Sequence, residues 1–286
     1  MAEEVIRRIQ ASSIEEAVAD ALKKANLSLP RDIVSALEKA YQQETDDLPK
    51  KAMYYVLKNI EMAESCGLPV CQDTGLVTVI AKIGEGVHIE GGTINEAIKA
   101  GVSRAYSENP FRASVVDDPL FARKNTDDNT PPVVHCDFVK GDRLQLLCMP
   151  KGFGSENMSS LKMFTPSATA EDIASYIVDV VKEAGANPCP PILLGIGIGG
   201  TFDSVAQLAK EALFLPVDAH HEKQEYAALE ERILAEVNAT GIGPQGFGGK
   251  TTALSVHIKT APTHVAGLPV AVCVSCYATR RVEITL

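Results

Sequence analysis

A thiol, an amide and a carboxylate stand side by side at Cys71-Gln72-Asp73. Pro69 and Gly75 flank these residues and predict a turn, which leads into the apolar, β-rich segment 76–83. Thiolates bind soft metals and carboxylates move protons, so this combination is typical of a metal-assisted acid–base site. On this stretch alone, a loop with one inert cysteine and one surface aspartate remains the alternative.

Two further cysteine motifs occur late in the chain. Cys189 stands in Asn187-Pro188-Cys189-Pro190-Pro191, where the prolines stiffen the backbone and suit a preorganised ligand. Cys273 and Cys276 form C-x-x-C on an expected β-run, and their odd separation puts the two side chains on opposite faces of a strand. One thiol can then reach a site while the other lies in the core. A thioredoxin-type redox pair would need both thiols on a strand-to-helix turn.

Two glycine-rich stretches are similar to nucleotide-binding motifs. Gly195 to Gly200 matches G-x-G-x-x-G between a predicted strand and a predicted helix, which is the pattern of a dinucleotide fold. Pro216 argues against this alternative, because it falls in the strand that would have to follow. The loop Gly241 to Thr251 resembles a phosphate-binding loop, but Pro244 replaces its first required glycine. The backbone amides of that loop remain candidates for facing an anion.

A long polar segment and a short glycine turn complete the candidates. Residues 108–132 are irregular and polar, and loops of this length inside compact domains are usually functional or mobile. Arg112 in this segment is a candidate anion binder, with a solvated loop arginine as the alternative. Gly152 and Gly154 stand next to serine, glutamate and asparagine, so the backbone there can approach a ligand closely, unless this is a plain glycine turn.

Composition narrows the classes of partner. The net charge of −10 argues against nucleic acid or an anionic membrane as partners, and a dianionic substrate would need local arginines. No run of about 18 apolar residues exists, so we expect no membrane span. Residues 1–10 lack an apolar signal core, which predicts a cytoplasmic protein. Seven cysteines without a secretory signal favour free thiols or metal ligands over disulfides.

Hydrophobic periodicity predicts an α/β (mixed α+β) fold with sheets flanked by helices, in one domain over residues 1–286. Helices are predicted within 12–66, after Thr93, after Thr169 and over 222–238; Ser12/Glu15, Ser13/Glu16, Thr93/Glu96 and Thr169/Asp172 fit capping boxes. Strands are predicted over 76–83, 133–138, 143–149, 192–196, 252–259 and 269–275, with residues 140–142 joining the second and third as a hairpin.

Five motifs taken together resemble one family, from about residue 12 to the end of the chain. They are 71–75, 187–191, 195–203, 241–252 and 276–281. In this order they resemble the α subunit, equivalently the N-terminal domain, of class I fumarases and L-tartrate dehydratases, which are iron–sulfur hydro-lyases. Several separate motifs in the right order are far more specific than any one alone. The resemblance implies the fold of that α subunit.

The resemblance also implies a cofactor, a [4Fe–4S] cluster held by Cys71, Cys189 and Cys276. Three thiolates on four irons leave one iron open, which can act as a Lewis acid on a substrate hydroxyl. The remaining cysteines are then buried or spectator thiols: Cys66, Cys136, Cys148 and Cys273.

Roles for other residues come from the same resemblance. It implies that Asp73, polarised by His264, transfers a proton, and that Gln72, Arg112 and Gly154 hold the carboxylates of a dicarboxylate substrate. A structural histidine remains the alternative for His264. The motifs look closer to fumarase, with L-tartrate dehydratase as the alternative.

A partner is implied as well. The sequence stops at Leu286, without the second domain of the single-chain form, so we expect a separate β subunit to complete the active site and α–α self-association into a heterotetramer. Arg112 is the best-placed cation for the substrate, with Lys250 and the pair Arg280-Arg281 as weaker candidates. Two other function classes stay open: an NAD-binding dehydrogenase and a non-catalytic iron–sulfur or interaction module.

Overall fold

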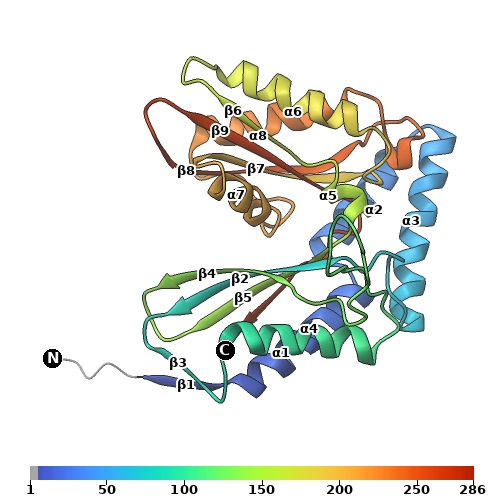
Figure 1. Cartoon of the computed structure of the whole chain (residues 1–286). Helices are drawn as coiled ribbons and strands as arrows, with labels where there is room; N and C mark the ends of the chain where they lie inside the picture. Colours follow the sequence, from blue (N-terminus) through green and yellow to red (C-terminus); the bar gives the residue numbers. More distant parts are fainter. Residues whose placement is uncertain (1–5) are drawn as a thin grey trace. The chain divides into compact units, whose positions relative to one another are not determined.

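The computed structural model describes residues 6–286, which divide into two compact units (Figure 1). Unit 1 contains the described residues up to Pro30, Ile60–Phe153 and Arg280–Leu286, and unit 2 contains Arg31–Asn59 and Gly154–Thr279. Each unit has a mixed four-stranded sheet with helices packed on it, which confirms the α/β prediction. The single domain over 1–286 stays a prediction. The inference about the N-terminus rests partly on residues 1–5, which lie outside the described residues.

The main sheet of unit 1 has the strand order β10-β5-β2-β4. Its central strand β2 (Leu76–Gly84) runs parallel to β4 (Val133–Val139) and antiparallel to β5 (Leu144–Lys151), which in turn pairs antiparallel with β10 (Val282–Thr285). Helices α1 (Ala11–Leu27) and α4 (Ile94–Glu108) pack on each other, and their core includes every second residue of β2 from Val77 to Ile83. This period of two places one face of β2 against the helices, and Thr78 and Ile80 on its other face are buried as well.

The predicted hairpin of β4 and β5 is wrong, because the two strands lie on opposite sides of β2. The turn between them instead passes around the end of β2. There, Gly84 N donates to Arg143 O and Gly86 N donates to Gly141 O, each at 2.9 Å. A Cβ on Gly84 would lie 2.5 Å from Gly141 O, so this close crossing requires glycine. The turn itself was predicted from the sequence, but how the two strands joined by this turn pair was not predicted correctly.

Of the three capping boxes predicted in unit 1, one is present and two are wrong. Thr93 and Glu96 form the predicted capping box at α4, since each side chain accepts from the other residue's backbone N–H. At α1, the N-cap is Gln10, and no side chain caps the helix. The predicted boxes of Ser12 and Ser13 are therefore wrong, because the helix already begins at Ala11. The reason is the preceding strand β1 (Arg7–Gln10), which pairs with β3 (Val87–Glu90) and leads directly into the helix.

The sheet of unit 2 has the strand order β6-β9-β7-β8. Strand β7 (Ile192–Gly200) runs parallel to β8 (Ala253–Thr263) and antiparallel to β9 (Leu268–Ser275), which pairs antiparallel with β6 (Ser160–Phe164). Helices α6 (Ala170–Ala184) and α8 (Gln224–Asn238) cover one face, and α7 (Ser204–Ala212) covers the other (Figure 1). The capping box predicted at Thr169 is present.

The glycines of 195–200 lie inside β7, not in a turn after it. Along this strand, Leu194, Ile196 and Ile198 pack in the core formed with α6 and α8. The alternate residues Gly195 and Gly197 face α7, where an added Cβ would lie 2.1 Å from Ala209 O and 2.2 Å from Val205 O. The glycines therefore serve close helix–strand packing, and the turn that a dinucleotide site needs is not formed by them.

The remaining helices confirm the predicted helical run of residues 12–66. With α1, it comprises α2 (Arg31–Gln43) and α3 (Asp47–Cys66). Two short helices, α5 (Phe153–Glu156) and the 3₁₀ helix η1 (Pro244–Gly246), lie in segments that we predicted as turns or loops. In the described part of the chain, none of the helices combines the length and apolar character needed to cross a membrane.

Candidate active site

The turn at residues 71–75 in unit 1 holds the Asp73 carboxylate at both oxygens. Oδ1 accepts a hydrogen bond from Gly75 N and Oδ2 accepts one from Phe153 N, each at 2.9 Å. Gly75 has φ +81°, and a Cβ there would lie 2.6 Å from Lys151 N, so the predicted glycine turn is confirmed and requires glycine. A Cβ on Gly152 would come 3.0 Å from Oδ2 of Asp73. Main-chain groups from two segments therefore orient this carboxylate before any ligand binds.

Buried polar side chains also donate hydrogen bonds to the backbone of this turn. The Tyr106 hydroxyl donates to Thr74 O at 2.5 Å and lies 3.2 Å from Gly75 O. The fully buried Asn129 donates to Gly75 O at 2.9 Å and accepts from Ser114 N at 2.8 Å. Burial raises the pKa of Tyr106 to about 12, so this donor stays protonated at neutral pH. Satisfied buried polar groups of this kind hold a loop in one geometry.

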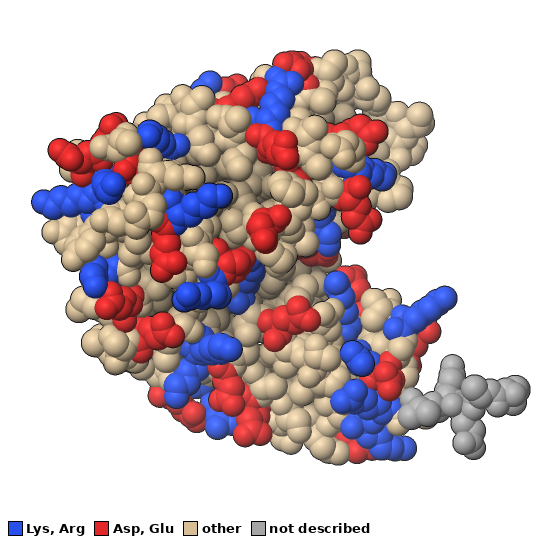
Figure 2. Space-filling view, turned by 180° about the vertical axis from the view of Figure 1, so that it is seen from behind, with Lys and Arg blue, Asp and Glu red and all other residues tan. Residues whose placement is uncertain are grey.

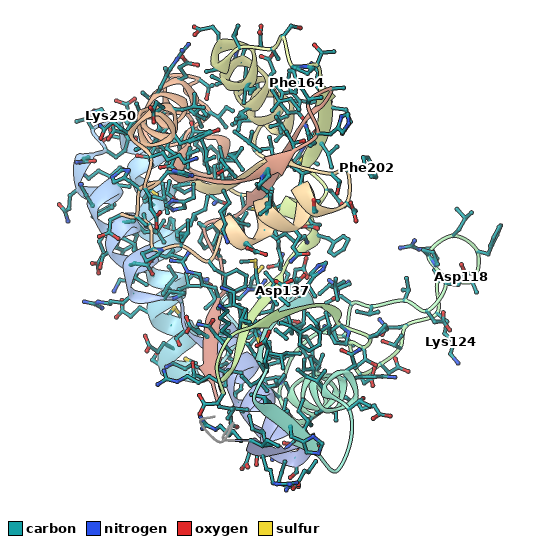
Figure 3. The ribbon with its side chains drawn as sticks, turned by 90° about the vertical axis from the view of Figure 1, so that its left-hand side faces the viewer. Asp118, Lys124, Asp137, Phe164, Phe202 and Lys250 are labelled. Atoms are coloured by element: carbon teal, nitrogen blue, oxygen red, sulfur yellow. The ribbon has the colours of Figure 1, made fainter. Side chains whose placement is uncertain are left out.

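Arg112 is tied to this turn through its backbone. Thr74 Oγ1 donates to Arg112 O at 2.8 Å. The guanidinium is exposed and makes no hydrogen bond or ion pair with any residue of 6–286. An arginine whose backbone is anchored and whose donors are unused suits the binding of a carboxylate. The segment continues as an ordered arm that carries Asp118 and Lys124 at its outer part (Figure 3).

Cys71 and Gln72 begin the turn. The Cys71 thiol is partly accessible, and its Sγ lies 3.7 Å from Gln72 Oε1, which is within the range of a weak sulfur hydrogen bond. Gln72 is exposed. Unit 1 thus brings four of the predicted residues to one turn and the segment bonded to it: Cys71, Gln72, Asp73 and Arg112.

Cys189 and Cys276 lie side by side in unit 2. Tyr277 N, next to Cys276, donates to Cys189 O at 3.4 Å. Cys189 is exposed and has φ +53°, a left-handed conformation that is uncommon outside glycine. Cys276 follows the end of β9 and is partly accessible. Its predicted place on a strand is wrong, although the predicted contrast with the buried Cys273 is confirmed.

The glycine-rich loop 241–251 supports the Cys189 segment. Gln245, at φ +54°, donates from both its backbone N and its Nε2 to Pro190 O, each at 2.8 Å. A Cβ on Gly246 would lie 2.4 Å from Ala186 Cβ, so the two loops are in close contact. The loop's amides bond within the chain, which makes the predicted anion role wrong for those of Gly246, Phe247, Gly248 and Lys250. The sequence contained no indication that Gln245 supports the Cys189 segment, because a glutamine rarely adopts positive φ.

Gly154 and His264 complete the predicted set. Gly154 lies in the single-turn helix α5, where a Cβ would make an ordinary contact 3.6 Å from Asn187 O, so packing does not require glycine. His264 is exposed in the turn after β8, and its Nδ1 accepts from Ala266 N at 3.1 Å. A neutral His264 therefore carries its proton on Nε2. The pairing of His264 with Asp73 and the substrate role of Gly154 stay predictions.

All seven cysteines are free thiols. Cys148 and Cys273 are buried, as expected for spectator thiols, and burial raises the pKa of Cys148 to about 12. Cys66 and Cys136 are exposed.

The donor set fits an iron–sulfur cluster in its chemistry. In residues 6–286, no three His, Cys, Asp or Glu side chains already converge as a metal site. However, Cys71, Cys189 and Cys276 are all accessible thiols outside strands, and none is consumed by a disulfide. Accessible thiolates in backbone-restrained loops are the ligands that such clusters use.

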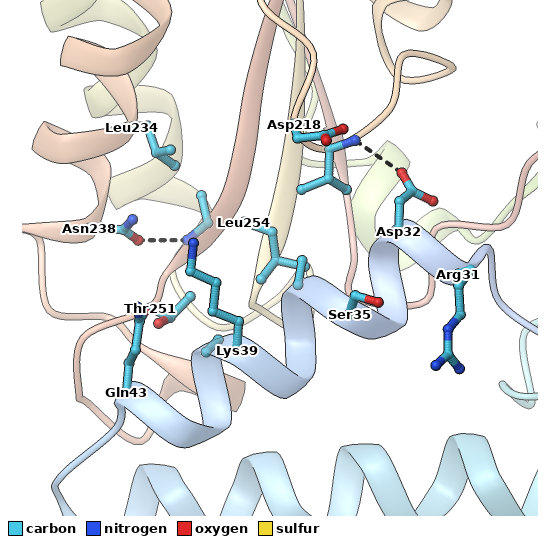
Figure 4. A pocket seen from close by; sticks show the side chains of 14 residues that line it. Arg31, Asp32, Ser35, Lys39, Gln43, Asp218, Leu234, Asn238, Thr251 and Leu254 are labelled. Atoms are coloured by element: carbon cyan, nitrogen blue, oxygen red, sulfur yellow. Dashed lines mark hydrogen bonds between the residues drawn. The ribbon is translucent and has the colours of Figure 1, made fainter.

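A separate cavity of about 640 Å³ lies in unit 2 and contains none of the predicted site residues. Its wall includes Lys39 of α2 and Asn238 of α8, with Asp218 on the other side (Figure 4). Asp32 in this wall is engaged, since it accepts a hydrogen bond from Val217 N at 3.0 Å.

Lysine and arginine side chains are interspersed with aspartate and glutamate over the molecular face in Figure 2, so that face has no continuous basic surface.

The model of the fumarate hydratase (Fumerase) family matches residues 15–285 of the chain. The chain belongs to this family. This confirms the resemblance inferred from the five motifs and identifies the protein as a hydro-lyase enzyme.

Curated relatives align with nearly the whole chain. A protein of Methanocaldococcus jannaschii, provisionally named L(+)-tartrate dehydratase subunit alpha, is 41% identical over 274 residues, which cover 94% of this chain and 95% of that protein. The L(+)-tartrate dehydratase subunit alpha of Escherichia coli K12 is 28% identical over 272 residues, with coverage of 94% and 89%. The counterpart from E. coli UTI89 is 29% identical over the same length. These relatives are named as subunits of a larger enzyme.

Proposed function

We propose that this chain is the cluster-bearing α subunit of a class I fumarate hydratase. The reaction adds water across the double bond of fumarate, with hydroxyl on one carbon and a proton on the other, and gives (S)-malate. The observation that carries the proposal is the Asp73 carboxylate, which main-chain amides hold at both oxygens in the same turn as Cys71. Family membership supplies the reaction class.

Cys71, Cys189 and Cys276 are the residues that would hold the [4Fe–4S] cluster. When bound, the cluster supplies an open iron that acts as a Lewis acid and makes the substrate hydroxyl a better leaving group. The seven free thiols support a reducing, cytoplasmic location, where such thiolates persist.

The chain's own residues bind substrate and move the proton. Asp73 transfers the proton at the substrate carbon, because its fixed carboxylate can give or take a proton without reorienting. The Nε2–H of His264 polarises this carboxylate. The free guanidinium of Arg112 binds one substrate carboxylate with a planar pair of donors, and the Gln72 amide and the Gly154 backbone bind beside it.

A separate β subunit completes the site in this proposal, and α subunits associate with each other in the full enzyme. The relatives' names as α subunits support a partner. The small number of available cationic side chains also supports a partner, because a rigidly held dicarboxylate needs cationic groups at both ends. Arg112 is free, whereas Arg280 is buried and Lys250 Nζ donates to Gln43 O at 3.2 Å.

Dehydration of L-tartrate to oxaloacetate is the second candidate, and the names of the relatives favour it. The first reaction is reversible, and its reverse, like the tartrate reaction, removes water from a hydroxylated four-carbon dicarboxylate. The same residues can therefore serve either one. The difference lies in the second hydroxyl of tartrate, which the site must accept or reject.

The test uses the anaerobically reconstituted chain together with its β subunit, assayed in parallel on fumarate, (S)-malate and L-tartrate. We expect turnover of fumarate and malate, and little activity from the chain without its partner. Turnover of L-tartrate alone would replace the first candidate by the second. An iron-loaded complex that turns over neither substrate would overturn the proposal, and full activity of the chain alone would remove the need for a partner.

A further inference from the structure

Arg280 is the largest fully buried side chain in the described part of the protein, with 1% of its surface exposed. Its Nη1 donates to Asn26 Oδ1 at 2.8 Å, and its Nε has no hydrogen-bond partner within residues 6–286. No carboxylate of the described residues pairs with it. This burial excludes Arg280 as the direct substrate ligand that we considered from the sequence.

Such an arrangement is costly for stability. Buried charges are normally paired, because the desolvation of an ion is unfavourable even after the surroundings relax. Among residues 6–286, a neutral amide is the only hydrogen-bond partner of the guanidinium. An apolar side chain of similar length would avoid this cost. Arg280 is therefore better explained by the side chain that it holds in place than by a contribution to the free energy of unfolding.

The group that Arg280 holds is Asn26, which is fully buried near the end of α1. Asn26 Nδ2 donates to Leu22 O at 3.0 Å, while Asn26 O accepts from Val70 N at 2.9 Å. Val70 immediately precedes Cys71. The Asn26 side chain also interacts with Tyr106, whose hydroxyl donates to Thr74 O. One buried cluster thus supports the turn at both of its ends.

We propose that Arg280 is a positioning residue for the turn 71–75. Its guanidinium fixes the side chain of Asn26, and Asn26 and Tyr106 then fix the backbone before Cys71 and after Asp73. Arg280 touches neither the substrate nor the reacting atoms. The inference rests on the proposed function only where it states that the turn presents Gln72 and Asp73 to a substrate.

Hydrogen exchange of the isolated chain tests the positioning without any catalysis. In Arg280→Met, the amides of Val70 and Gly75 should exchange about tenfold faster, since that factor corresponds to the loss of about one hydrogen bond's worth of local stability. Amides inside β2 should be unchanged. Arg281→Met, at the adjacent and only partly buried position, is the matched control and should leave the turn unaffected. Unchanged turn amides, or equal acceleration across unit 1, would overturn the proposal.

Stability measurements separate positioning from general support of the fold. Arg280→Met removes a buried charge that lacks a carboxylate, so the free energy of unfolding should stay equal or rise. Arg280→Lys keeps the charge but replaces the guanidinium, whose Nη1 bonds to Asn26, by a shorter ammonium group, so its turn amides should exchange at intermediate rates. If Arg280→Met does not fold, the exchange rates of the turn amides in Arg280→Lys provide the test instead. If the turn amides of Arg280→Lys exchange as slowly as those of the unchanged protein, the guanidinium is not what holds Asn26, and its proposed role is overturned.

A double variant tests the route through Asn26. If Arg280 acts through this side chain, Asn26→Ala with Arg280→Met should speed exchange of the turn no more than Asn26→Ala does alone. Additive effects on the turn would show that Arg280 acts by another route and would overturn the proposal.

Activity provides the last readout. In the iron-loaded complex, Arg280→Met should lower kcat by about 10- to 100-fold while iron content stays constant, because small displacements of catalytic groups cost about that much. Faster exchange with unchanged kcat would support the role of Arg280 in holding the turn and would overturn the claim that this support matters for catalysis. If the unchanged protein has no hydratase activity, the proposed function fails, while the exchange experiment still decides the role of Arg280.

Discussion

The two units use the same arrangement of three strands but hold their functional residues by different means. In unit 1, β2 is parallel to β4 and antiparallel to β5; in unit 2, β7 is parallel to β8 and antiparallel to β9. In each unit, a cysteine-containing turn leads into the first of these strands. The Asp73 turn and the two predicted cysteines of unit 2 lie where that strand begins and its antiparallel neighbour ends, near Leu76 and Lys151 in unit 1 and near Leu193 and Ser275 in unit 2. His264 lies elsewhere, because it follows β8 beside the opposite end of β7, where Thr263 pairs with Gly200.

The difference lies in what supports each turn. Unit 1 presents a carboxylate and an amide, and buried side chains hold the turn: Asn26, Tyr106, Asn129 and Arg280. Unit 2 presents two thiols, and mainly main-chain groups and one glutamine hold them. A proton-transfer group must keep both oxygens oriented, which takes a dense polar network. A metal ligand needs an anchored backbone and an accessible sulfur, which prolines and loop contacts provide.

The largest effect is expected at the carboxylate of unit 1. Asp73→Asn should lower kcat by roughly 10²–10⁴ with iron content unchanged, because the side chain can no longer transfer a proton. Steady-state kinetics on the iron-loaded complex measure this. Asp118→Asn is the matched control, since Asp118 also accepts hydrogen bonds from backbone amides, in the exposed arm of the same unit. Near-normal turnover of Asp73→Asn would reduce Asp73 to a structural residue.

The buried network of unit 1 predicts a pH effect. The pKa of Tyr106 is about 12 in the folded protein and about 10 when unfolded, so its stabilisation is complete below pH 10 and is lost as pH rises towards 12. Over that window, the unchanged protein should lose about 2–3 kcal/mol of unfolding free energy that Tyr106→Phe does not lose. Denaturant titrations at several pH values measure this difference.

The exposed Tyr55 provides the control for that experiment. Tyr55→Phe should follow the pH dependence of the unchanged protein throughout. Equal pH slopes for Tyr106→Phe and Tyr55→Phe would contradict the role of Tyr106 as a buried, protonated donor.

The smallest effect concerns the backbone of unit 2. Cys189 has φ +53°, a conformation that costs a side chain about 1–2 kcal/mol but costs glycine little. Cys189→Gly should therefore be more stable to denaturant than Cys189→Ala by about 1 kcal/mol, in the isolated chain without cluster. Cys276 is not at positive φ, so the same pair of substitutions there should have the opposite sign. The same sign at both positions would show that backbone strain is not specific to Cys189.

Apart from the capping boxes at Ser12 and Ser13, which are wrong, several local features were predicted correctly, because their causes are local. The capping boxes at Thr93 and Thr169 and the turn at Gly75 all depend on neighbouring residues. Strand pairing depends on distant segments, so the partners of β4 and β5 were assigned wrongly. The short strands β1, β3, β6 and β10 were missed for the same reason, since each is defined by the strand beside it.

The candidate site divides in the same way. The motifs identified Cys71, Gln72 and Asp73, and the structure shows how the main chain orients Asp73. The supporting residues were not predicted. Arg280 was predicted only as a weaker candidate cation for the substrate. An arginine is rarely buried without a carboxylate, and only the fold shows that Arg280 lies beside Asn26.

Iron and sulfide content of single Cys→Ser variants, after anaerobic reconstitution of the chain, tests the central claim that Cys71, Cys189 and Cys276 share one cluster. We expect about four irons per chain in the unchanged protein and in the control Cys273→Ser. Cys71→Ser, Cys189→Ser and Cys276→Ser should each lose most of the iron and sulfide. If Cys71→Ser keeps its full iron content, or Cys273→Ser loses iron while Cys276→Ser retains it, the assignment of one shared cluster to these three cysteines is wrong.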